Sequence, residues 1–346
     1  MLWTMAIILK QLNTQIPGRQ TASQEVGVAI YLFHSIVYGY LSLAIKPTRV
    51  SVLTLENISK SYGKIQALKN LSFEIPQGCV FGVLGPNGSG KTTLLSIILD
   101  VLKADNGNFL WFGNPGSPEQ RKKIGSLLET PNFYHYLSAV NNLKITQSIS
   151  RRGDATSIDN VLQKVSLFER RNSRFSTYSL GMKQRLAIAA ALMGDPQVLV
   201  LDEPTNGLDP VGIAEIRELI IELSKKGHTI IMASHLLDEV EKVCTHVAII
   251  KKGSLITTGP VEDVLADEDT VEIGAADLVA LATVMGHYGN GTKVQTEGQF
   301  LLVNMPKSTA RLDDINNYCF SKGIVLNHLL FKKKRLEAKF FELTNN

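Results

Sequence analysis

The chain has 346 residues, enough for roughly two domains and a full hydrophobic core, which excludes a small scaffold held together by disulfides. Apolar residues make up 44% and charged residues 20%, close to globular averages, so we expect most of the chain to fold. The formal net charge of +4 does not indicate a nucleic-acid partner, and none is expected, while the three cysteines lack zinc-site spacing and are expected to be buried thiols.

Residues 1–51 form an N-terminal extension in which 26–45 contain no Asp, Glu, Lys or Arg. Such a run is long enough to cross a bilayer, but its histidine, two glycines and three tyrosines make insertion marginal. Three interpretations are open: a single membrane span, a loosely ordered extension, or a segment outside the native product because translation begins near Val52. One span alone could not form a membrane pathway.

Residues 52–260 are predicted to form the first folded domain. Alternating segments at 53–58 and 71–75 flank a polar turn and predict an antiparallel edge sheet. The apolar run 79–84 then precedes a glycine-rich turn and a helix over 91–102, which gives the order strand, loop, helix.

The second half of this domain alternates between apolar runs and helical patterns. Residues 130–178 are polar with helical pieces such as 160–168, and they indicate a helical subdomain. Runs at 197–201 and 229–233 are typical of buried parallel strands. Because helical patterns at 181–193, 211–225 and 236–243 separate or follow these runs, we predict an α/β fold: a mainly parallel sheet with helices on both faces.

Residues 261–346 are predicted to form a small C-terminal α+β accessory domain. Its expected elements are a strand at 270–273, a helix at 275–285, a hairpin of 292–296 with 300–304, a helix at 311–321 and a strand at 324–330. This β-α-β-β-α-β order is ferredoxin-like. A closing helix is expected at 336–343, and the basic run 332–335 is expected to be a solvated turn.

The strongest chemical signal is a nine-residue loop between a predicted strand and a predicted helix. It reads Gly85-Pro86-Asn87-Gly88-Ser89-Gly90-Lys91-Thr92-Thr93, which satisfies the phosphate-loop pattern G-x-x-x-x-G-K-[ST]. In such a loop, backbone N–H groups and the helix N-terminus bind one anion, Lys91 reaches the β and γ phosphates, and Thr92 can place its hydroxyl on Mg²⁺. A plain glycine turn would leave Lys91 and Thr92 unexplained.

An acidic pair follows the apolar run 198–201, at the carboxyl end of a predicted buried strand. Ligands of open α/β sheets bind at that edge. Asp202 is suited to hold Mg²⁺ through water, and Glu203 to orient and polarise an attacking water. The alternative is that the two carboxylates cap a helix that starts near Pro204.

Further motifs occur in a fixed order along 52–259, and together they resemble the nucleotide-binding subunit of ATP-binding cassette (ABC) transporters, a P-loop NTPase family. The segment 178–185, with Ser179 and Gly181, is similar to the family's signature loop, and Asn206-Gly207-Leu208-Asp209 is similar to its D-loop. His235 stands at the switch histidine, Tyr62 at the aromatic residue that stacks on adenine, and Glu129 at the Q-loop glutamine.

The resemblance implies that two subunits close head to tail over two ATP molecules. Ser179 and Gly181 would then bind the γ-phosphate held by the partner, and Asp209 would couple the two sites. Lys91, Glu203 and His235 would carry catalysis, with ATP and Mg²⁺ as cofactors and with Thr92, Asp202 and Glu129 near the metal. The partners implied are a separate transmembrane permease and a second copy or a homologous ATPase subunit, at the cytoplasmic face of the membrane.

Two departures from the family pattern narrow the resemblance. Glu129 replaces the usual glutamine and adds a charge near the metal, and Leu180 and Met182 differ from the commonest signature, L-S-G-G-Q. These variants are similar to the peptide-antibiotic export and immunity branch. The runner-up function is a soluble ABC-type ATPase that acts as a switch on ribosomes or DNA, although neither a second phosphate loop nor sustained heptads occur here.

Overall fold

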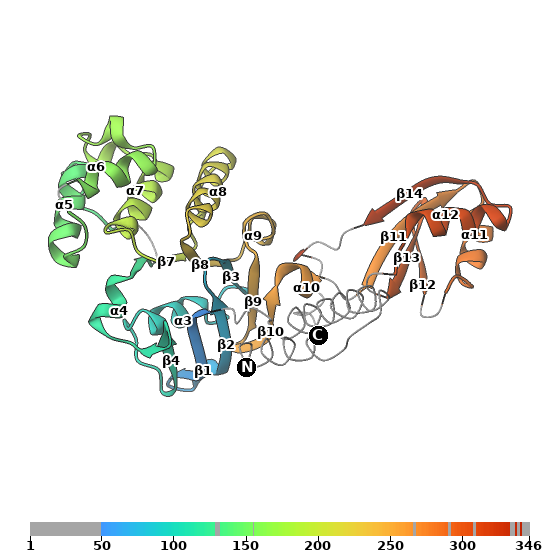
Figure 1. Ribbon diagram of the computed structural model, residues 1–346, viewed down its shortest axis with the longest axis horizontal. Coiled ribbons are helices and arrows are strands. Elements are labelled where there is room, and N and C mark those ends of the chain that lie inside the picture. The colour runs from blue at the N-terminus through green and yellow to red at the C-terminus, as the bar shows by residue number, and fades with distance from the viewer. Residues whose placement is uncertain are drawn as a thin grey trace, which may run out of the picture. The chain divides into compact units, whose positions relative to one another are not determined.

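A computed structural model of the chain describes residues 50–128, 132–154, 156–265, 268–289, 292–306 and 309–332, together with Leu336, Glu337 and Phe340 (Figure 1). The candidate span at 26–45 and the predicted Q-loop residue Glu129 lie outside the described residues. The alternative that translation begins near Val52 stays a prediction. Among the described residues, no helix combines the length and apolar character that a membrane crossing needs.

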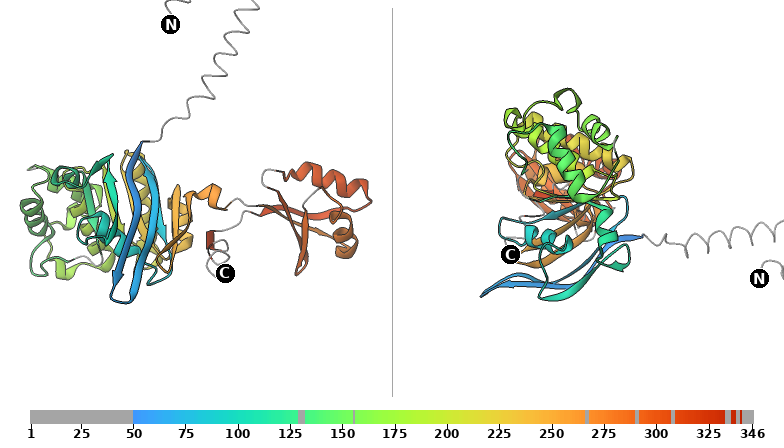
Figure 2. Two further views of the ribbon diagram at one scale, coloured as in Figure 1. Left: turned by 90° about the horizontal axis from the view of Figure 1, so that it is seen from below. Right: turned by 90° about the vertical axis from the view of Figure 1, so that its left-hand side faces the viewer.

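The predicted antiparallel edge sheet is present and is larger than predicted. It has the strand order β2-β1-β4-β5 and consists of β1 (Ser51–Tyr62), β2 (Ile65–Pro76), β4 (Asn106–Trp111) and β5 (Asn114–Pro115). Figure 2 shows β1 and β2 as a long paired ribbon, which turns through Gly63 at φ 59°. Bulges interrupt the register of β1 with β2, so strict alternation covers only part of each strand and the sequence pattern underestimated their length.

The central sheet is mainly parallel, which confirms the predicted fold class. Its strand order is β10-β9-β3-β8-β7-β6. Its strands are β3 (Val80–Leu84), β6 (Ile124–Leu127), β7 (Val198–Asp202), β8 (Thr229–Ser234), β9 (His246–Lys251) and β10 (Ser254–Pro260). All pairs are parallel except β9 with β10, a hairpin that the sequence analysis did not predict.

Helices cover both faces of this sheet, as predicted. Successive residues of a strand point to opposite faces. Accordingly, Val198 and Val200 of β7 join the apolar cluster of α3 (Lys91–Ile98) and the edge sheet, whereas Leu199 and Leu201 join the cluster of the remaining helices. Those helices are α5 (Ala139–Ser150), α6 (Ser157–Lys164), α7 (Leu180–Leu192), α8 (Pro210–Lys225) and α9 (Leu237–Val243).

Two predicted helix ends are wrong, for local reasons. The helix predicted over 91–102 ends at Ile98, because Asp100 adopts a left-handed backbone at φ 58°; Leu102 still packs against the core from outside the helix. The piece predicted over 160–168 is α6, which ends at Lys164 before Ser166 turns left-handed at φ 56°. In both cases an apolar residue beyond the helix fits the helical period by coincidence. The short helix α4 (Pro118–Lys122) was not predicted.

The C-terminal elements follow the predicted β-α-β-β-α-β order, and the sheet order is β12-β13-β11-β14. The elements are β11 (Glu268–Ala275), α11 (Leu278–Met285), β12 (Lys293–Glu297), β13 (Phe300–Pro306), α12 (Leu312–Ser321) and β14 (Leu326–Lys332). They share an apolar cluster that includes Val271, Leu301 and Ile315. Lys332, expected in a turn, ends β14 and forms ion pairs with Glu272 and Glu297.

The segments on either side of this C-terminal sheet pack against the apolar core of residues 52–260. The unpredicted helix α10 (Val261–Leu265) places Val261 and Val264 in the cluster that contains α7 and α8. Leu336 and Phe340, the described apolar residues of the predicted closing helix, belong to the same cluster, and the rest of that helix lies outside the described residues. The division of the chain at 260/261 stays a prediction.

Candidate functional site

The predicted phosphate loop lies between β3 and α3, where the motif requires it. Gly90 adopts φ 107°, and a Cβ there would approach the carbonyl oxygen of Ala67 to 2.5 Å. A Cβ on Gly85 would approach the carbonyl oxygen of Ile250 to 2.4 Å. Close packing against neighbouring backbone therefore requires glycine at both positions, and Gly88, at φ 78°, has the left-handed backbone that glycine adopts most readily.

Lys91, the first residue of α3, is buried and points back into the loop. Its Nζ donates to the carbonyl oxygens of Gly85 at 2.8 Å and Pro86 at 3.4 Å. The Ser89 hydroxyl is also buried, and it has no hydrogen-bond partner among the described residues. Among the described residues, the buried ammonium group of Lys91 contacts two carbonyl oxygens and the carboxylate of Glu203, and the same loop contains an unsatisfied hydroxyl. These features suit a loop that receives an anion.

The acidic pair lies at the carboxyl end of β7, as predicted. Asp202 is the last residue of the strand and is buried. Glu203 has φ 48°, an uncommon conformation for this residue type, and its N–H donates to the carbonyl oxygen of Ala233 at 3.0 Å. The alternative that the pair caps a helix near Pro204 is wrong, because the next helix, α8, begins at Pro210 and is capped by Asp209.

Glu203 joins the phosphate loop to the predicted switch histidine. Its Oε1 lies 3.7 Å from Nζ of Lys91, and its Oε2 lies 2.8 Å from Nδ1 of His235. The strands β7 and β8 are parallel neighbours, so the residues that follow them meet at one edge of the sheet. The contact between Glu203 and His235 was not predicted, although the two parallel strands are the signal that could have indicated it.

The two signature residues and the D-loop aspartate lie at helix starts. Ser179 caps α7: its Oγ accepts from the N–H of Met182 at 3.2 Å. Asp209 caps α8 in the same way, through the N–H of Gly212 at 3.0 Å. Among the described residues, neither Ser179 nor Gly181 forms a hydrogen bond or ion pair with the group Lys91, Glu203 and His235.

Tyr62 lies at the end of β1 with half of its surface exposed, and the Nζ of Lys60 lies 6.0 Å from its ring centre. An exposed ring in the edge sheet is free to stack on a planar base. The role of Tyr62 in binding adenine stays a prediction. The same holds for the roles of the other predicted site residues, among them Asn87, Thr92 and Thr93. Glu129 lies outside the described residues.

The residues present fit a magnesium ion. Thr92 exposes its side chain in the first turn of α3, and Asp202 ends β7. The described part of the chain contains no cluster of three or more His, Cys, Asp or Glu side chains that could hold a metal by itself. A hydroxyl and a carboxylate supply the oxygen ligands that suit Mg²⁺, which usually takes one or two protein ligands together with phosphate oxygens and water.

Comparison with known proteins identifies the family. The family model described as "ABC transporter" matches residues 68–206. YhcH of Bacillus subtilis, an uncharacterized ABC transporter ATP-binding protein, is 37% identical over 299 residues, which are 85% of this chain and 96% of the relative. The chain belongs to the ABC transporter ATP-binding proteins. It is the subunit that binds and hydrolyses ATP for an ABC transporter, as predicted.

Two other relatives in this family have named transport roles. SrtF of Streptococcus pyogenes, a lantibiotic transport ATP-binding protein, is 40% identical over 205 residues, 59% of this chain and 89% of the relative. BcrA of Bacillus licheniformis, a bacitracin transport ATP-binding protein, is 40% identical over 214 residues, 61% of this chain and 70% of the relative. The comparisons do not favour the soluble switch on ribosomes or DNA.

Solved structures confirm the P-loop ATPase fold. CbiO1 of Clostridium perfringens, part of the ABC transporter complex CbiONQ, aligns with a TM-score of 0.57 at 32% identity and covers 62% of this ABC transporter subunit and 90% of that chain. A dimeric ATP-binding cassette in a post-hydrolysis state with ADP and Pi aligns with a TM-score of 0.54 at 27% identity, over 60% of this chain and 98% of that chain.

Proposed function

We propose that this subunit closes head to tail with a second copy, or with a homologous ATPase subunit, over two ATP molecules. One observation carries the proposal. Lys91, Glu203 and His235 meet at one edge of the central sheet, whereas the capped start of α7, with Ser179 and Gly181, forms no hydrogen bond or ion pair with them in the described residues. Each nucleotide would then also be bound by the partner's signature loop, whose free N–H groups suit a γ-phosphate.

The catalytic chemistry proposed for Lys91 begins with an exchange of partners. A triphosphate is a stronger partner for an ammonium group than a neutral carbonyl is. Binding is therefore expected to draw Lys91 from the carbonyls of Gly85 and Pro86 to the β and γ phosphates. That movement also takes Lys91 from Oε1 of Glu203, which becomes available to a water molecule.

Glu203 then acts on the attacking water. Its Oε2 remains bonded to His235 and its backbone to Ala233, so the carboxylate is held in one orientation while Oε1 accepts a proton from the water. His235 positions Glu203 and can also contact the γ-phosphate. Thr92 and Asp202 would hold Mg²⁺, which would supply charge neutralisation at the phosphates.

We further propose that a transmembrane permease binds beside α5, with the subunit peripheral to the cytoplasmic face of the membrane. A pocket of about 390 Å³ lies between residues 132–134 and α5, close in sequence to the predicted Q-loop residue Glu129. Tyr134 and Ile149, which line it, are exposed by 52% and 79%. The ring of Tyr136, which is 69% exposed, lies 5.9 Å from the ring of Tyr134. Exposed apolar patches of this kind mark interaction sites. The lantibiotic and bacitracin roles of SrtF and BcrA support export of a peptide antibiotic.

Coexpression with a multi-span membrane protein from a neighbouring gene tests the permease proposal. The complex should be recovered with the unmodified chain and lost with Tyr136→Asp, while ATP binding is retained. Phe320→Asp is the matched control, because Phe320 is an equally exposed aromatic residue on α12. Failure to recover a complex, together with ATPase stimulation by RNA or DNA, would overturn the transport role.

Size-exclusion chromatography of Glu203→Gln tests the head-to-tail arrangement. The variant should elute as a dimer with ATP and Mg²⁺ and as a monomer without nucleotide, since bound ATP is retained when its cleavage is slow. A protein that stays monomeric with saturating nucleotide contradicts the proposal.

A further inference from the structure

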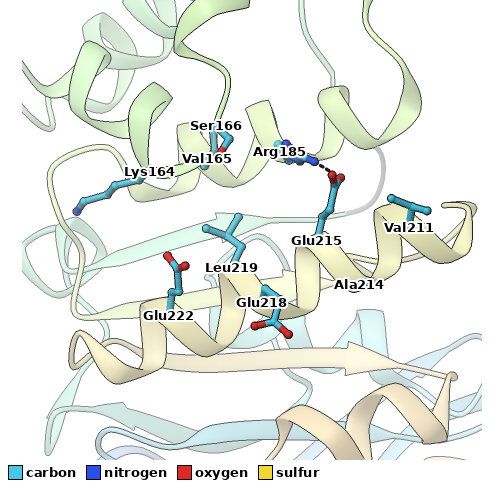
Figure 3. Close-up of a pocket in the computed structure, with 10 residues that line it drawn as sticks. All are labelled: Lys164, Val165, Ser166, Arg185, Val211, Ala214, Glu215, Glu218, Leu219 and Glu222. Carbon is cyan, nitrogen blue, oxygen red and sulfur yellow. Dashed lines mark hydrogen bonds and ion pairs between the residues drawn. The ribbon is translucent and has the colours of Figure 1, made fainter.

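The helices that follow the signature loop and the D-loop are tied together by an ion pair. Figure 3 shows Arg185 of α7 facing Glu215 of α8, and the guanidinium Nη2 and the carboxylate Oε2 are in hydrogen-bond contact. Arg185 lies six residues after the cap Ser179, and Glu215 lies six residues after the cap Asp209. The pair therefore joins α7 and α8 at equivalent positions, each six residues after the capping residue of its helix.

Arg185 and Glu215 both line a pocket between α6, α7 and α8. This pocket has a volume of about 450 Å³ and is lined by residues of α6, α7 and α8, with Leu219 and Val211 among its apolar lining. Arg185 is only 18% exposed, and burial lowers the pKa of its guanidinium from the ordinary value. A charge partly removed from water is stabilised by a partner of opposite charge, and Glu215 supplies that partner for Arg185.

A second observation places the tips of the two loops close together. Gly207 of the D-loop has φ 74°, and a Cβ at that position would lie 3.2 Å from Cδ2 of Leu180, the residue after Ser179. The tips of the signature loop and the D-loop of one subunit therefore lie close enough to leave little room for a side chain at position 207, and the ion pair joins their helices six residues after each cap. The ion pair and the close approach of the two tips lie at separate points, and together they restrict rotation of one helix relative to the other.

We propose that the Arg185–Glu215 ion pair is a positioning link that holds the signature loop and the D-loop of one subunit in a single arrangement, so that both are presented together to the nucleotide bound by the partner. The inference rests on the proposed head-to-tail dimer. Arg185 and Glu215 act through Ser179, Gly181 and Asp209, and they do not themselves touch the nucleotide.

The positioning role predicts a separation between nucleotide capture and dimer closure. The phosphate loop lies between β3 and α3, away from the link, so Glu215→Gln should leave ATP affinity of the isolated subunit unchanged. The maximal ATPase rate of Glu215→Gln should fall about tenfold. When Glu215→Gln is combined with Glu203→Gln, the protein concentration needed for half-maximal dimerisation should rise about tenfold, which corresponds to a loss of roughly 1.4 kcal/mol in the free energy of dimerisation.

Charge reversal distinguishes this role from simple loss of stability. Arg185→Glu alone should impair dimerisation, and Arg185→Glu combined with Glu215→Arg should restore at least part of it. Glu218→Gln is the matched control, since Glu218 lines the same pocket from α8 and forms no ion pair among the described residues. Thermal melts of each variant identify any that fail to fold, and Glu215→Gln, whose side chain is 47% exposed, is expected to fold.

The outcomes separate the two proposals. If Glu203→Gln alone does not dimerise, the head-to-tail arrangement fails and the link fails with it. Suppose that Glu203→Gln dimerises, that the double variant Glu203→Gln/Glu215→Gln dimerises equally well, and that Glu215→Gln alone has an unchanged ATPase rate. The dimer then stands, and the positioning role is overturned. Reduced dimerisation without rescue by the reversed pair also overturns it.

Discussion

Nδ1 of His235 lies 2.8 Å from one carboxylate oxygen of Glu203, and the other oxygen lies 3.7 Å from Nζ of Lys91. Glu203 is thus the residue through which the phosphate loop and the loop after β8 are connected. Its left-handed backbone costs free energy, which the surrounding contacts must offset. Such strain is often found at functional sites, and here it directs the carboxylate between the two partners.

Glu203→Gln is expected to separate ATP binding from ATP hydrolysis. The amide keeps the shape of the side chain but cannot accept a proton from water, so the ATPase rate should fall by about 10²–10⁴-fold. Nucleotide affinity should not weaken. Phosphate release and equilibrium ATP binding measure the two effects, with Glu56→Gln on the exposed part of β1 as the control. Loss of ATP binding in the Gln variant would contradict the assigned role.

Lys91→Ala is expected to weaken binding itself. The variant loses an ammonium group that can reach the phosphates, and a hydrogen bond to a charged group contributes about 1.5–3 kcal/mol, or about ten- to a hundredfold in affinity. Titration with ATP and Mg²⁺ measures the change. Lys69→Ala removes an exposed lysine from β2 and should bind normally. Equal affinities for the two variants would exclude Lys91 as the phosphate lysine.

The three cysteines are expected to be inert in the folded protein. Cys79, Cys244 and Cys319 are buried, and burial raises the pKa of the Cys244 and Cys319 thiols above the ordinary value. Because the reactive species is the thiolate, iodoacetamide at mildly alkaline pH should label no native cysteine and all three after denaturation. Mass spectrometry measures the labelling, and Ser148→Cys, on the exposed side of α5, is the reactive control. Rapid native labelling of Cys244 would contradict the described core.

Leu336→Ala is expected to destabilise the protein, although Leu336 lies near the end of the sequence. Leu336 is fully buried in the cluster that contains Val240, and its N–H donates to Oε2 of Glu241 at 2.8 Å. Truncating a buried leucine costs about 2–5 kcal/mol. Chemical denaturation should show a clear loss for Leu336→Ala and almost none for Val325→Ala, which is 70% exposed. Equal stabilities would mean that the contact with α9 contributes nothing.

Much of the fold and part of the site could be predicted because their signals are local. The phosphate loop must stand between a strand and a helix for its N–H groups to converge, and the structure places it there. Runs such as 198–201 are apolar on both faces because both faces of the central sheet are covered. The capping role of Ser179 follows from its own helix, so it too was predictable.

Pairings between distant segments could not be predicted in the same way. The hairpin of β9 with β10 depends on partners along the sheet, and the early end of α3 depends on a left-handed Asp100 that the apolar spacing does not reveal. The contact between Arg185 and Glu215 joins residues 30 positions apart on two helices whose packing no sequence period describes.

The amino-acid sequence by itself determined most of the strands and helices of the central sheet and predicted which loop binds phosphate, because side-chain period, glycine placement and helix capping act between near neighbours. Only the tertiary structure decided that Glu203 lies between Lys91 and His235 and that α7 is tied to α8, because those contacts arise when separate strands and helices pack around one core.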